Sequence, residues 1–293
     1  MEFRGAFTAL STPFRDGAID EAAYREFIEW QIEQGIDGLV PCGTTGEAAT
    51  LTHEEQGRII RICVEQVKGR LPVIAGAGSN STKEAIELTS LAKEAGADAT
   101  LQITPYYNKP TPEGLIAHFK AIADKVSIPF VIYNVPSRTG LNLLPQDLKR
   151  IVDAVPQAIA VKEATGNMCQ AAQVVEYCGQ GFQLLSGDDF TVIPLLSVGG
   201  QGVISVISNI MPKAMSDMCR LFMEKDHQGA IDLSLKMAPV IRAMFMETNP
   251  IPVKTALRMM GIFPRAEFRL PIVPLRDENV PRLEAVLKEA GLL

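Results

Sequence analysis

Apolar runs of strand length recur along the chain and are separated by longer amphipathic stretches. Short runs of β-branched and apolar residues are typical of β-strands. Several of the runs lack strict alternation, as expected of parallel strands that are buried on both faces. The pattern predicts eight strands, at residues 6–11, 38–43, 72–78, 99–105, 129–135, 158–164, 183–188 and 202–207.

The stretches between the strands carry helical periodicity. Residues 52–69 predict a helix that begins with a capping box, because Thr52 is followed three residues later by Glu55. Residues 81–97 predict a second helix, which closes at Gly96. Strands and helices that alternate in this way predict parallel strands joined by right-handed crossovers.

Eight such units can form either a closed (β/α)8 TIM barrel or an open doubly wound sheet. An open sheet usually carries a glycine-rich phosphate-binding turn after its first strand. Here the first strand runs into residues 11–17, STPFRDG, and no G-x-G-x-x-G occurs anywhere in the chain. The sequence therefore predicts a TIM barrel, and its 293 residues leave room for an appendage beyond the usual ~250.

The pattern changes after the eighth strand. Helical segments are predicted around 212–224, 228–247 and 280–290, with no further strand of comparable quality. The proline-rich stretches 249–254 and 269–275 predict turns between packed elements. We therefore expect a catalytic barrel domain at residues 1–224 and a C-terminal helical domain at residues 225–293.

Composition narrows the class of protein. Hydrophobic residues make up 47% and charged residues 21%, as in ordinary globular domains. The net charge of −6 is not typical of a nucleic-acid-binding protein, which needs a patch of basic side chains. No apolar run reaches the ~20 residues that a membrane helix needs. No signal-peptide pattern opens the chain, so a cytoplasmic protein is expected. The five cysteines lack C-x-x-C or metal-ligand spacing, so we expect reduced, structural thiols and no metal site.

The active site of a TIM barrel lies at the carboxyl ends of its strands. Lys162, in the stretch AVKEATG, is placed at the end of the sixth predicted strand. Lysine is a nucleophile only as the free amine, and burial at an apolar barrel mouth would lower its pKa. By spacing alone, a solvated lysine at the strand end is an equally good interpretation.

Neighbouring strand ends carry polar groups that suit a carboxylate substrate. Tyr133 ends the preceding strand and could move protons to and from a group on Lys162, although taken alone it fits a core tyrosine somewhat better. The run GTTGE, residues 43–47, has the glycines of a tight turn whose N–H groups can hold a carboxylate. Arg138 follows in a loop, and its planar fork suits a carboxylate too.

Six motifs occur together in one order: GTTGE, TPYYN, YNVPSRTG, VKEATG, LLSGDD and GVISV. With ETNPIPVK at residues 247–254, this order resembles the dihydrodipicolinate synthase family of pyruvate-dependent class I aldolases over the whole chain. The resemblance implies a homotetramer built as a dimer of dimers. It also implies a condensation of pyruvate with L-aspartate 4-semialdehyde, followed by cyclisation, which is the first committed step toward diaminopimelate and L-lysine.

The resemblance also assigns roles to residues. Lys162 matches the lysine that forms a covalent Schiff base with pyruvate, so no separate cofactor is implied. Tyr133, Thr44 and Tyr107 match a hydroxyl relay, with the equivalent of Tyr107 reaching in from a neighbouring subunit. Thr45 and the backbone of Ile204 match groups that hold pyruvate, Arg138 matches the receptor of the semialdehyde carboxylate, and Gly187 is expected in the substrate site. No histidine or carboxylate is expected among the motif residues that face the substrate.

Bacterial members of this family often carry an L-lysine feedback site at the dimer interface. Its positions match Ala49, Leu51, His53, Asn80, Glu84 and Tyr106, and the carboxylate of Glu84 could receive the ammonium of L-lysine. Gln56 departs from the pattern, because some inhibited members have a histidine there.

Two other functions are compatible with parts of the pattern. An N-acetylneuraminate lyase or a keto-deoxy sugar acid aldolase would share the barrel, the lysine and the tyrosine, but Tyr107 and Arg138 match the synthase. A barrel that only senses a keto acid is the alternative of another class. It would not need an amine nucleophile beside a tyrosine, so the sequence favours an enzyme.

Overall fold

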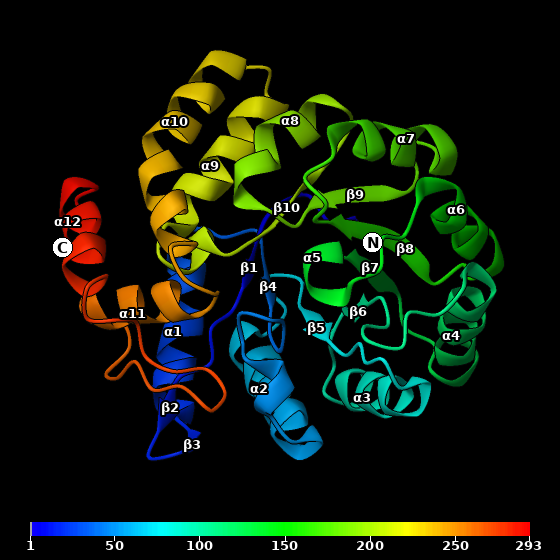
Figure 1. The fold of residues 1–293 in the computed structure, drawn as a ribbon, viewed down its shortest axis with the longest axis horizontal. Coiled ribbons are helices and arrows are strands. Elements are labelled where there is room, and N and C mark those ends of the chain that lie inside the picture. Colours follow the sequence, from blue (N-terminus) through cyan, green and yellow to red (C-terminus); the bar gives the residue numbers. More distant parts are fainter. Residues whose placement is uncertain (1) are drawn as a thin grey trace.

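The computed structural model describes residues 2–293 and contains one eight-stranded parallel sheet (Figure 1). The sheet order is β4-β1-β10-β9-β8-β7-β6-β5. Its strands are β1 (Gly5–Ala9), β4 (Gly38–Val40), β5 (Ile74–Gly76), β6 (Ala99–Ile103), β7 (Phe130–Asn134), β8 (Ala158–Glu163), β9 (Gln183–Ser186) and β10 (Gly202–Ser205). All eight predicted strands are present, and each ends one to three residues earlier than predicted.

The two outermost strands of this order meet and close the sheet. Leu39 of β4 forms a parallel bridge with Val73, and the Leu39 N–H donates to the Pro72 carbonyl at 3.0 Å. At the next step the Gly76 N–H donates to the carbonyl of Pro41 at 2.9 Å. The predicted TIM barrel is thereby confirmed.

Helices surround the barrel on the outside (Figure 1). The predicted capping box is present at the start of α2, where the side chains of Thr52 and Glu55 each accept from the other residue's backbone N–H. Gly96, with φ +88°, follows the C-cap Ala95 and stops α3. The outer helices are α1 (Glu21–Glu33), α2 (His53–Val67), α3 (Thr82–Glu94), α4 (Pro112–Lys125), α6 (Pro145–Ala154), α7 (Met168–Cys178), α8 (Val192–Ser197) and α9 (Pro212–Met223).

Three helices follow the barrel and lie along one side of it (Figure 1): α10 (His227–Met244), α11 (Ile251–Met259) and α12 (Val280–Glu289). The sequence predicted α10 and α12 but was wrong about residues 251–254, which begin α11 instead of forming a turn. Proline is tolerated in the first turn of a helix, where the backbone N–H groups have no intrahelical partner. Pro252 occupies this position.

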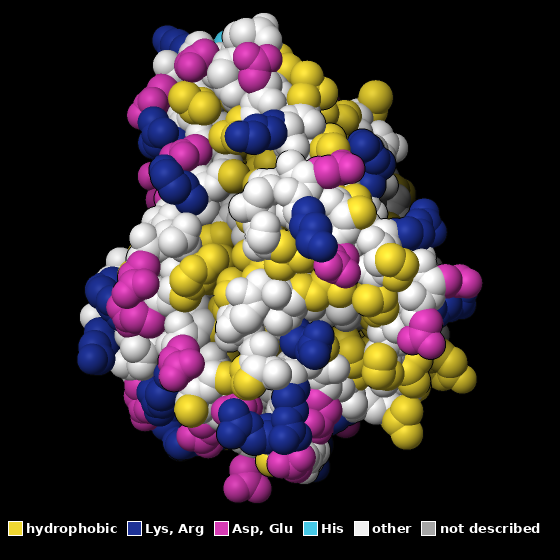
Figure 2. Space-filling model, turned by 90° about the vertical axis from the view of Figure 1, so that its left-hand side faces the viewer, with side chains coloured by type: hydrophobic (Ala, Val, Ile, Leu, Met, Phe, Trp, Pro, Cys, Tyr) yellow, Lys and Arg dark blue, Asp and Glu magenta, His cyan; other side chains and the backbone are white. Residues whose placement is uncertain are grey.

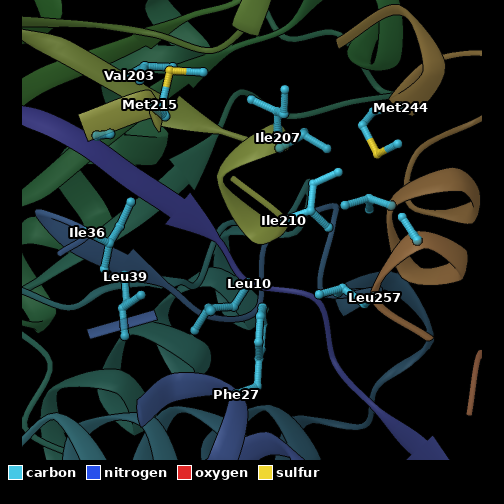
Figure 3. Packing of buried hydrophobic residues seen from close by; sticks show 14 of the residues in the cluster. Leu10, Phe27, Ile36, Leu39, Val203, Ile207, Ile210, Met215, Met244 and Leu257 are labelled. Carbon is cyan, nitrogen blue, oxygen red and sulfur yellow. The ribbon is translucent and has the colours of Figure 1, made fainter. Parts of the chain in front are cut away.

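The C-terminal helices share a hydrophobic core with the outer face of the barrel. Met244 of α10 and Leu257 of α11 face Leu10, Ile207 and Ile210 (Figure 3), and all five side chains are buried. On the face shown in Figure 2, acidic and basic side chains are interspersed. Because one core extends across residue 224, the division into domains 1–224 and 225–293 stays a prediction.

Candidate active site

Lys162 and Tyr133 lie opposite each other on neighbouring strands. In the register of β7 and β8, Val131 pairs with Ala160 and Tyr133 pairs with Lys162. Val131, Tyr133 and Ala160 belong to the apolar cluster inside the barrel, while Val161 packs on the outside. Since side chains alternate between the two faces of a strand, Lys162 points inward beside Tyr133. Its Nζ lies 4.3 Å from the centroid of the tyrosine ring.

A cavity of about 320 Å³ opens over this pair. Residues from several strand ends and from the segment after α10 line it. They are Ala9, Val40, Gly43, Thr44, Thr45, Leu101, Tyr133, Val135, Ser137, Arg138, Lys162, Ala164, Gly187, Asp188, Phe190, Val206, Phe245 and Asn249. Six residues predicted from the sequence, Lys162, Tyr133, Thr44, Thr45, Arg138 and Gly187, are therefore brought together.

The amine of Lys162 is held in a state that favours nucleophilic attack. Its side chain is only 6% exposed, and burial lowers the pKa of the ammonium from 10.5 to about 7. The carboxylate of Asp189 opposes this change, and the guanidinium of Arg138 adds to it. About half of the lysine is then the free amine at neutral pH, so the solvated alternative does not apply to this structure.

Tyr133 carries a proton that it can share with a neighbouring hydroxyl. Burial raises the pKa of its phenol to about 12. The charge of Arg138 and a hydrogen bond with Thr44 act in the opposite direction and lower the pKa. The phenol therefore stays protonated at neutral pH. A hydroxyl both donates and accepts, so the pair of Tyr133 and Thr44 can pass a proton along the cavity wall.

Gly187 leaves room for the lysine side chain. A Cβ at this position would lie 2.7 Å from the Cβ of Ala164 and 3.1 Å from the Cε of Lys162. The Gly187 N–H also donates to the carbonyl of Glu163 at 2.8 Å, which holds the loop after β9 against the end of β8. A side chain at position 187 would therefore clash with Ala164 and crowd the side chain of Lys162.

The turn that carries Thr44 and Thr45 is tied to distant parts of the chain. Glu47 at its end has φ +56° and is buried. Its Oε1 lies 2.6 Å from the Nζ of Lys254 in α11, and neither side chain is more than 2% exposed. Thr45 accepts a hydrogen bond from the Nδ2 of Asn249 at 3.0 Å.

One expectation was wrong, and the roles of two residues that do not line the cavity of this chain stay predictions. Asp188 lines the cavity, so the expectation of no carboxylate facing the substrate was wrong. Tyr107 is 90% exposed and is not among the residues that line the cavity. Ile204 is fully buried inside the barrel, opposite Phe7, and does not line the cavity either.

The C-terminal segment contributes to the site, which the sequence pattern did not indicate. Asn249 and Phe245 line the cavity although they lie more than 80 residues after Lys162. The motif ETNPIPVK was visible in the sequence, but no local pattern indicated that its asparagine reaches Thr45. Phe190, which packs at 5.8 Å from Phe245 between ring centroids, was also missed.

The six residues predicted to bind L-lysine lie around α2 and α3. The Asn80 Nδ2 donates to the Tyr106 carbonyl at 3.2 Å, and the Ser79 hydroxyl donates to Glu84 at 2.8 Å. His53 lies 3.5 Å from Glu87, which is on the same helix as Glu84. Ala49 belongs to the short 3-10 helix Ala48–Thr50, and the buried Leu51 follows it.

Other features bear on alternative chemistry. Burial raises the pKa of the Cys42 thiol, which opposes its use as a nucleophile. Within residues 2–293, no group of three or more His, Cys, Asp or Glu side chains is arranged to hold a metal ion. No helix in this range is long and apolar enough to cross a bilayer. A second hollow of about 460 Å³, beside Arg258 and Arg265, contains no lysine or cysteine.

Comparison with known proteins agrees with this geometry. The family model described as the dihydrodipicolinate synthetase family matches residues 2–290. The curated 4-hydroxy-tetrahydrodipicolinate synthase of Maridesulfovibrio salexigens is 66% identical over 293 residues, with all of both chains covered. The crystal structure of the chloride-inhibited dihydrodipicolinate synthase of Acinetobacter baumannii, complexed with pyruvate, is 44% identical and has a TM-score of 0.96. The crystal structure of DHDPS from Cyanidioschyzon merolae with lysine bound is 39% identical and has the same TM-score. Each of these comparisons covers 99% of this chain and 99% of the other. The chain therefore belongs to the dihydrodipicolinate synthetase family.

Proposed function

We propose that this protein is a 4-hydroxy-tetrahydrodipicolinate synthase, a lyase of the carbon–oxygen class that condenses pyruvate with L-aspartate 4-semialdehyde. The observation that carries the proposal is the buried Lys162, paired with Tyr133 in the strand register inside a cavity of about 320 Å³. A lowered pKa and a neighbouring proton carrier are what Schiff-base chemistry needs.

The first half of the reaction builds a nucleophile from pyruvate. The free amine of Lys162 attacks the ketone carbon, and the resulting carbinolamine loses water to give an iminium ion. The iminium withdraws electrons from the methyl group, which then loses a proton and becomes an enamine carbon. Tyr133 donates the proton that leaves with water, and its phenolate then takes up the proton that the methyl group loses, with Thr44 as its hydrogen-bond partner.

The second half joins the two substrates and frees the enzyme. The enamine carbon attacks the aldehyde carbon of the semialdehyde, whose oxygen takes up a proton to become a hydroxyl. The amino group of the adduct then attacks the iminium carbon and closes the ring, and the amine of Lys162 leaves unchanged. No oxidant or metal ion enters this balance.

The remaining residues of the cavity suit the carboxylates of the two substrates. Thr45 is proposed to bind the carboxylate of pyruvate, and Arg138 the carboxylate of the semialdehyde at the entrance. Arg138 is exposed on the short helix α5 (Pro136–Thr139), and its Nη2 lies 3.5 Å from the Asn249 carbonyl. Gly187 is proposed to keep the space beside the lysine clear for substrate.

We further propose that the protein acts as a homotetramer, a dimer of dimers, in the cytoplasm. Tyr107 supports a role for a second subunit, because its exposed side chain lies outside the cavity of its own chain. It would complete the relay in the neighbouring copy. Inhibition by L-lysine is proposed at the site around Glu84 and Tyr106; the solved relative with lysine bound supports it by analogy.

The proposal is tested by an assay with pyruvate and L-aspartate 4-semialdehyde, coupled to reduction of the cyclic product, run beside cleavage assays for N-acetylneuraminate and keto-deoxy sugar acids. Turnover in the first assay alone is expected. Turnover of a sugar acid alone would show that the protein is an N-acetylneuraminate lyase or a keto-deoxy sugar acid aldolase instead. Binding of pyruvate without turnover of any substrate would favour the sensor.

A further inference from the structure

Asn249 reaches from the C-terminal segment into the cavity and contacts Thr45. Its Nδ2 donates to the Oγ1 of Thr45 at 3.0 Å. Both residues line the cavity, and their exposed fractions are 6% for Asn249 and 2% for Thr45. A hydrogen bond this well buried is little weakened by competition with water.

The direction of this hydrogen bond has a chemical consequence. A threonine hydroxyl has one proton and two lone pairs, whereas an amide nitrogen only donates. Because Thr45 accepts from Asn249, its own proton is free for another acceptor. The Oδ1 of Asn249 has no hydrogen-bond partner within residues 2–293. The reverse orientation of the amide would instead bury unpaired N–H donors, which folded proteins tolerate less well.

A hydroxyl that presents its proton to the cavity is the complement of a carboxylate, which only accepts. The same segment also holds the far end of the turn, through the buried contact of Lys254 with Glu47 at 2.6 Å. In addition, the Nη2 of Arg138 donates a hydrogen bond to the backbone carbonyl of Asn249 at 3.5 Å. The C-terminal segment therefore touches the turn at two points and the entrance arginine at a third.

We propose that Asn249 is a positioning residue that fixes the hydroxyl of Thr45 as a hydrogen-bond donor to the carboxylate of the keto acid, so that the C-terminal segment sets the affinity for pyruvate. The inference rests on the proposed function, because it assumes that pyruvate occupies this cavity. It concerns binding of the keto acid and not the later carbon–carbon bond formation.

The test compares Asn249→Asp with Asn249→Ala. Aspartate has the shape of asparagine but offers only acceptors when ionised, so Thr45 would donate to the new carboxylate instead of to pyruvate. Alanine leaves Thr45 free to donate to pyruvate. The readout is the pyruvate concentration that gives half-maximal borohydride-trapped adduct, measured by intact mass. We expect a roughly ten- to hundredfold increase for Asn249→Asp and a smaller one for Asn249→Ala.

A role limited to filling space predicts the opposite order, because alanine leaves a void and aspartate does not. Equal half-saturation in wild type and Asn249→Asp, or a larger effect of alanine, would overturn the proposal. Gln102→Glu is the matched control for a new buried acid: Gln102 is fully buried, and its Nε2 donates to the Oγ1 of Thr89 at 2.8 Å, outside the cavity. This control variant should need the same pyruvate concentration as wild type for half-maximal trapped adduct.

Circular dichroism decides whether each variant is folded. If Asn249→Asp does not fold, the proposal is tested by a double-mutant cycle of Asn249→Ala and Thr45→Val. The effect of Asn249→Ala should disappear when the Thr45 hydroxyl is absent, and independent, additive effects would overturn the proposal. A wild-type protein that traps no pyruvate at all refutes the proposed function and this inference with it, whereas normal trapping with unchanged variants refutes the inference alone.

Discussion

The buried ion pair of Glu47 and Lys254 offers a quantitative test of how the C-terminal helices support the active site. Lys254 is 0% exposed in α11, with its Nζ 2.6 Å from Glu47 and 4.1 Å from the ring centroid of Phe14. Burial lowers the pKa of Lys254 to about 8, and Glu47 opposes the change. The other carboxylate oxygen of Glu47 accepts from the Arg269 N–H at 3.3 Å.

Replacing Lys254 by methionine would leave the carboxylate of Glu47 buried without its cation. The expected cost is about 3–5 kcal/mol in the free energy of unfolding. At ~2–4 °C per kcal/mol for a large domain, the melting temperature should fall by about 6–20 °C. The double variant Glu47→Gln with Lys254→Met removes both charges and keeps an acceptor for Arg269, so most of the loss should be recovered.

Urea denaturation and thermal melts of the two single variants and the double variant measure these costs. The exposed pair of Lys120 and Asp124, 3.1 Å apart, is the control, and Lys120→Met should change the melting temperature little. A double variant that loses as much stability as the two single variants combined would show that the two charges are not coupled, contrary to this prediction.

The other predictions concern chemistry at the site. Because burial lowers the pKa of Lys162 to about 7, the free amine at pH 7 increases about a thousandfold over an ordinary lysine. The rate of borohydride-trapped adduct formation should therefore rise with pH, be half-maximal near pH 7 and level off above it; a midpoint above pH 9 would contradict the burial argument. Gly187→Ala should lower kcat at least tenfold in a folded protein, since its Cβ would lie 3.1 Å from the Cε of Lys162, whereas Gly181→Ala, with nothing within 4 Å, should not. Millimolar L-lysine should slow wild type but not Glu84→Gln, and a wild-type rate that L-lysine leaves unchanged would remove the feedback site.

The barrel was predictable because each of its strands is a local apolar run. The predicted strands ran too long for a physical reason: Cys42 continues the apolar run after β4, although its backbone, with φ +57°, is no longer extended. The helix α11 was missed because its early proline was interpreted as a turn, whereas the first helical turn accommodates proline without losing a hydrogen bond.

The candidate site was predictable where a strand end supplies the residue. The strand pattern placed Tyr133 and Lys162 next to each other, and their register confirms it. Two contacts join residues that are more than 200 positions apart, Asn249 with Thr45 and Lys254 with Glu47. Local periodicity in the sequence cannot predict contacts over such distances. A residue such as Tyr107, proposed to act in another copy, is recognisable only through resemblance.

Mass spectrometry of the protein after treatment with pyruvate and borohydride shows directly whether Lys162 is the nucleophile. We expect one reduced pyruvate adduct per chain, located at Lys162 by peptide mapping and missing from Lys162→Ala. The double variant Glu47→Gln with Lys254→Met is the matched control, because it removes the other buried lysine that has a lowered pKa without leaving Glu47 unpaired, and it should still give the adduct. No adduct in wild type, or an adduct that persists in Lys162→Ala, would show that Lys162 is not the nucleophile.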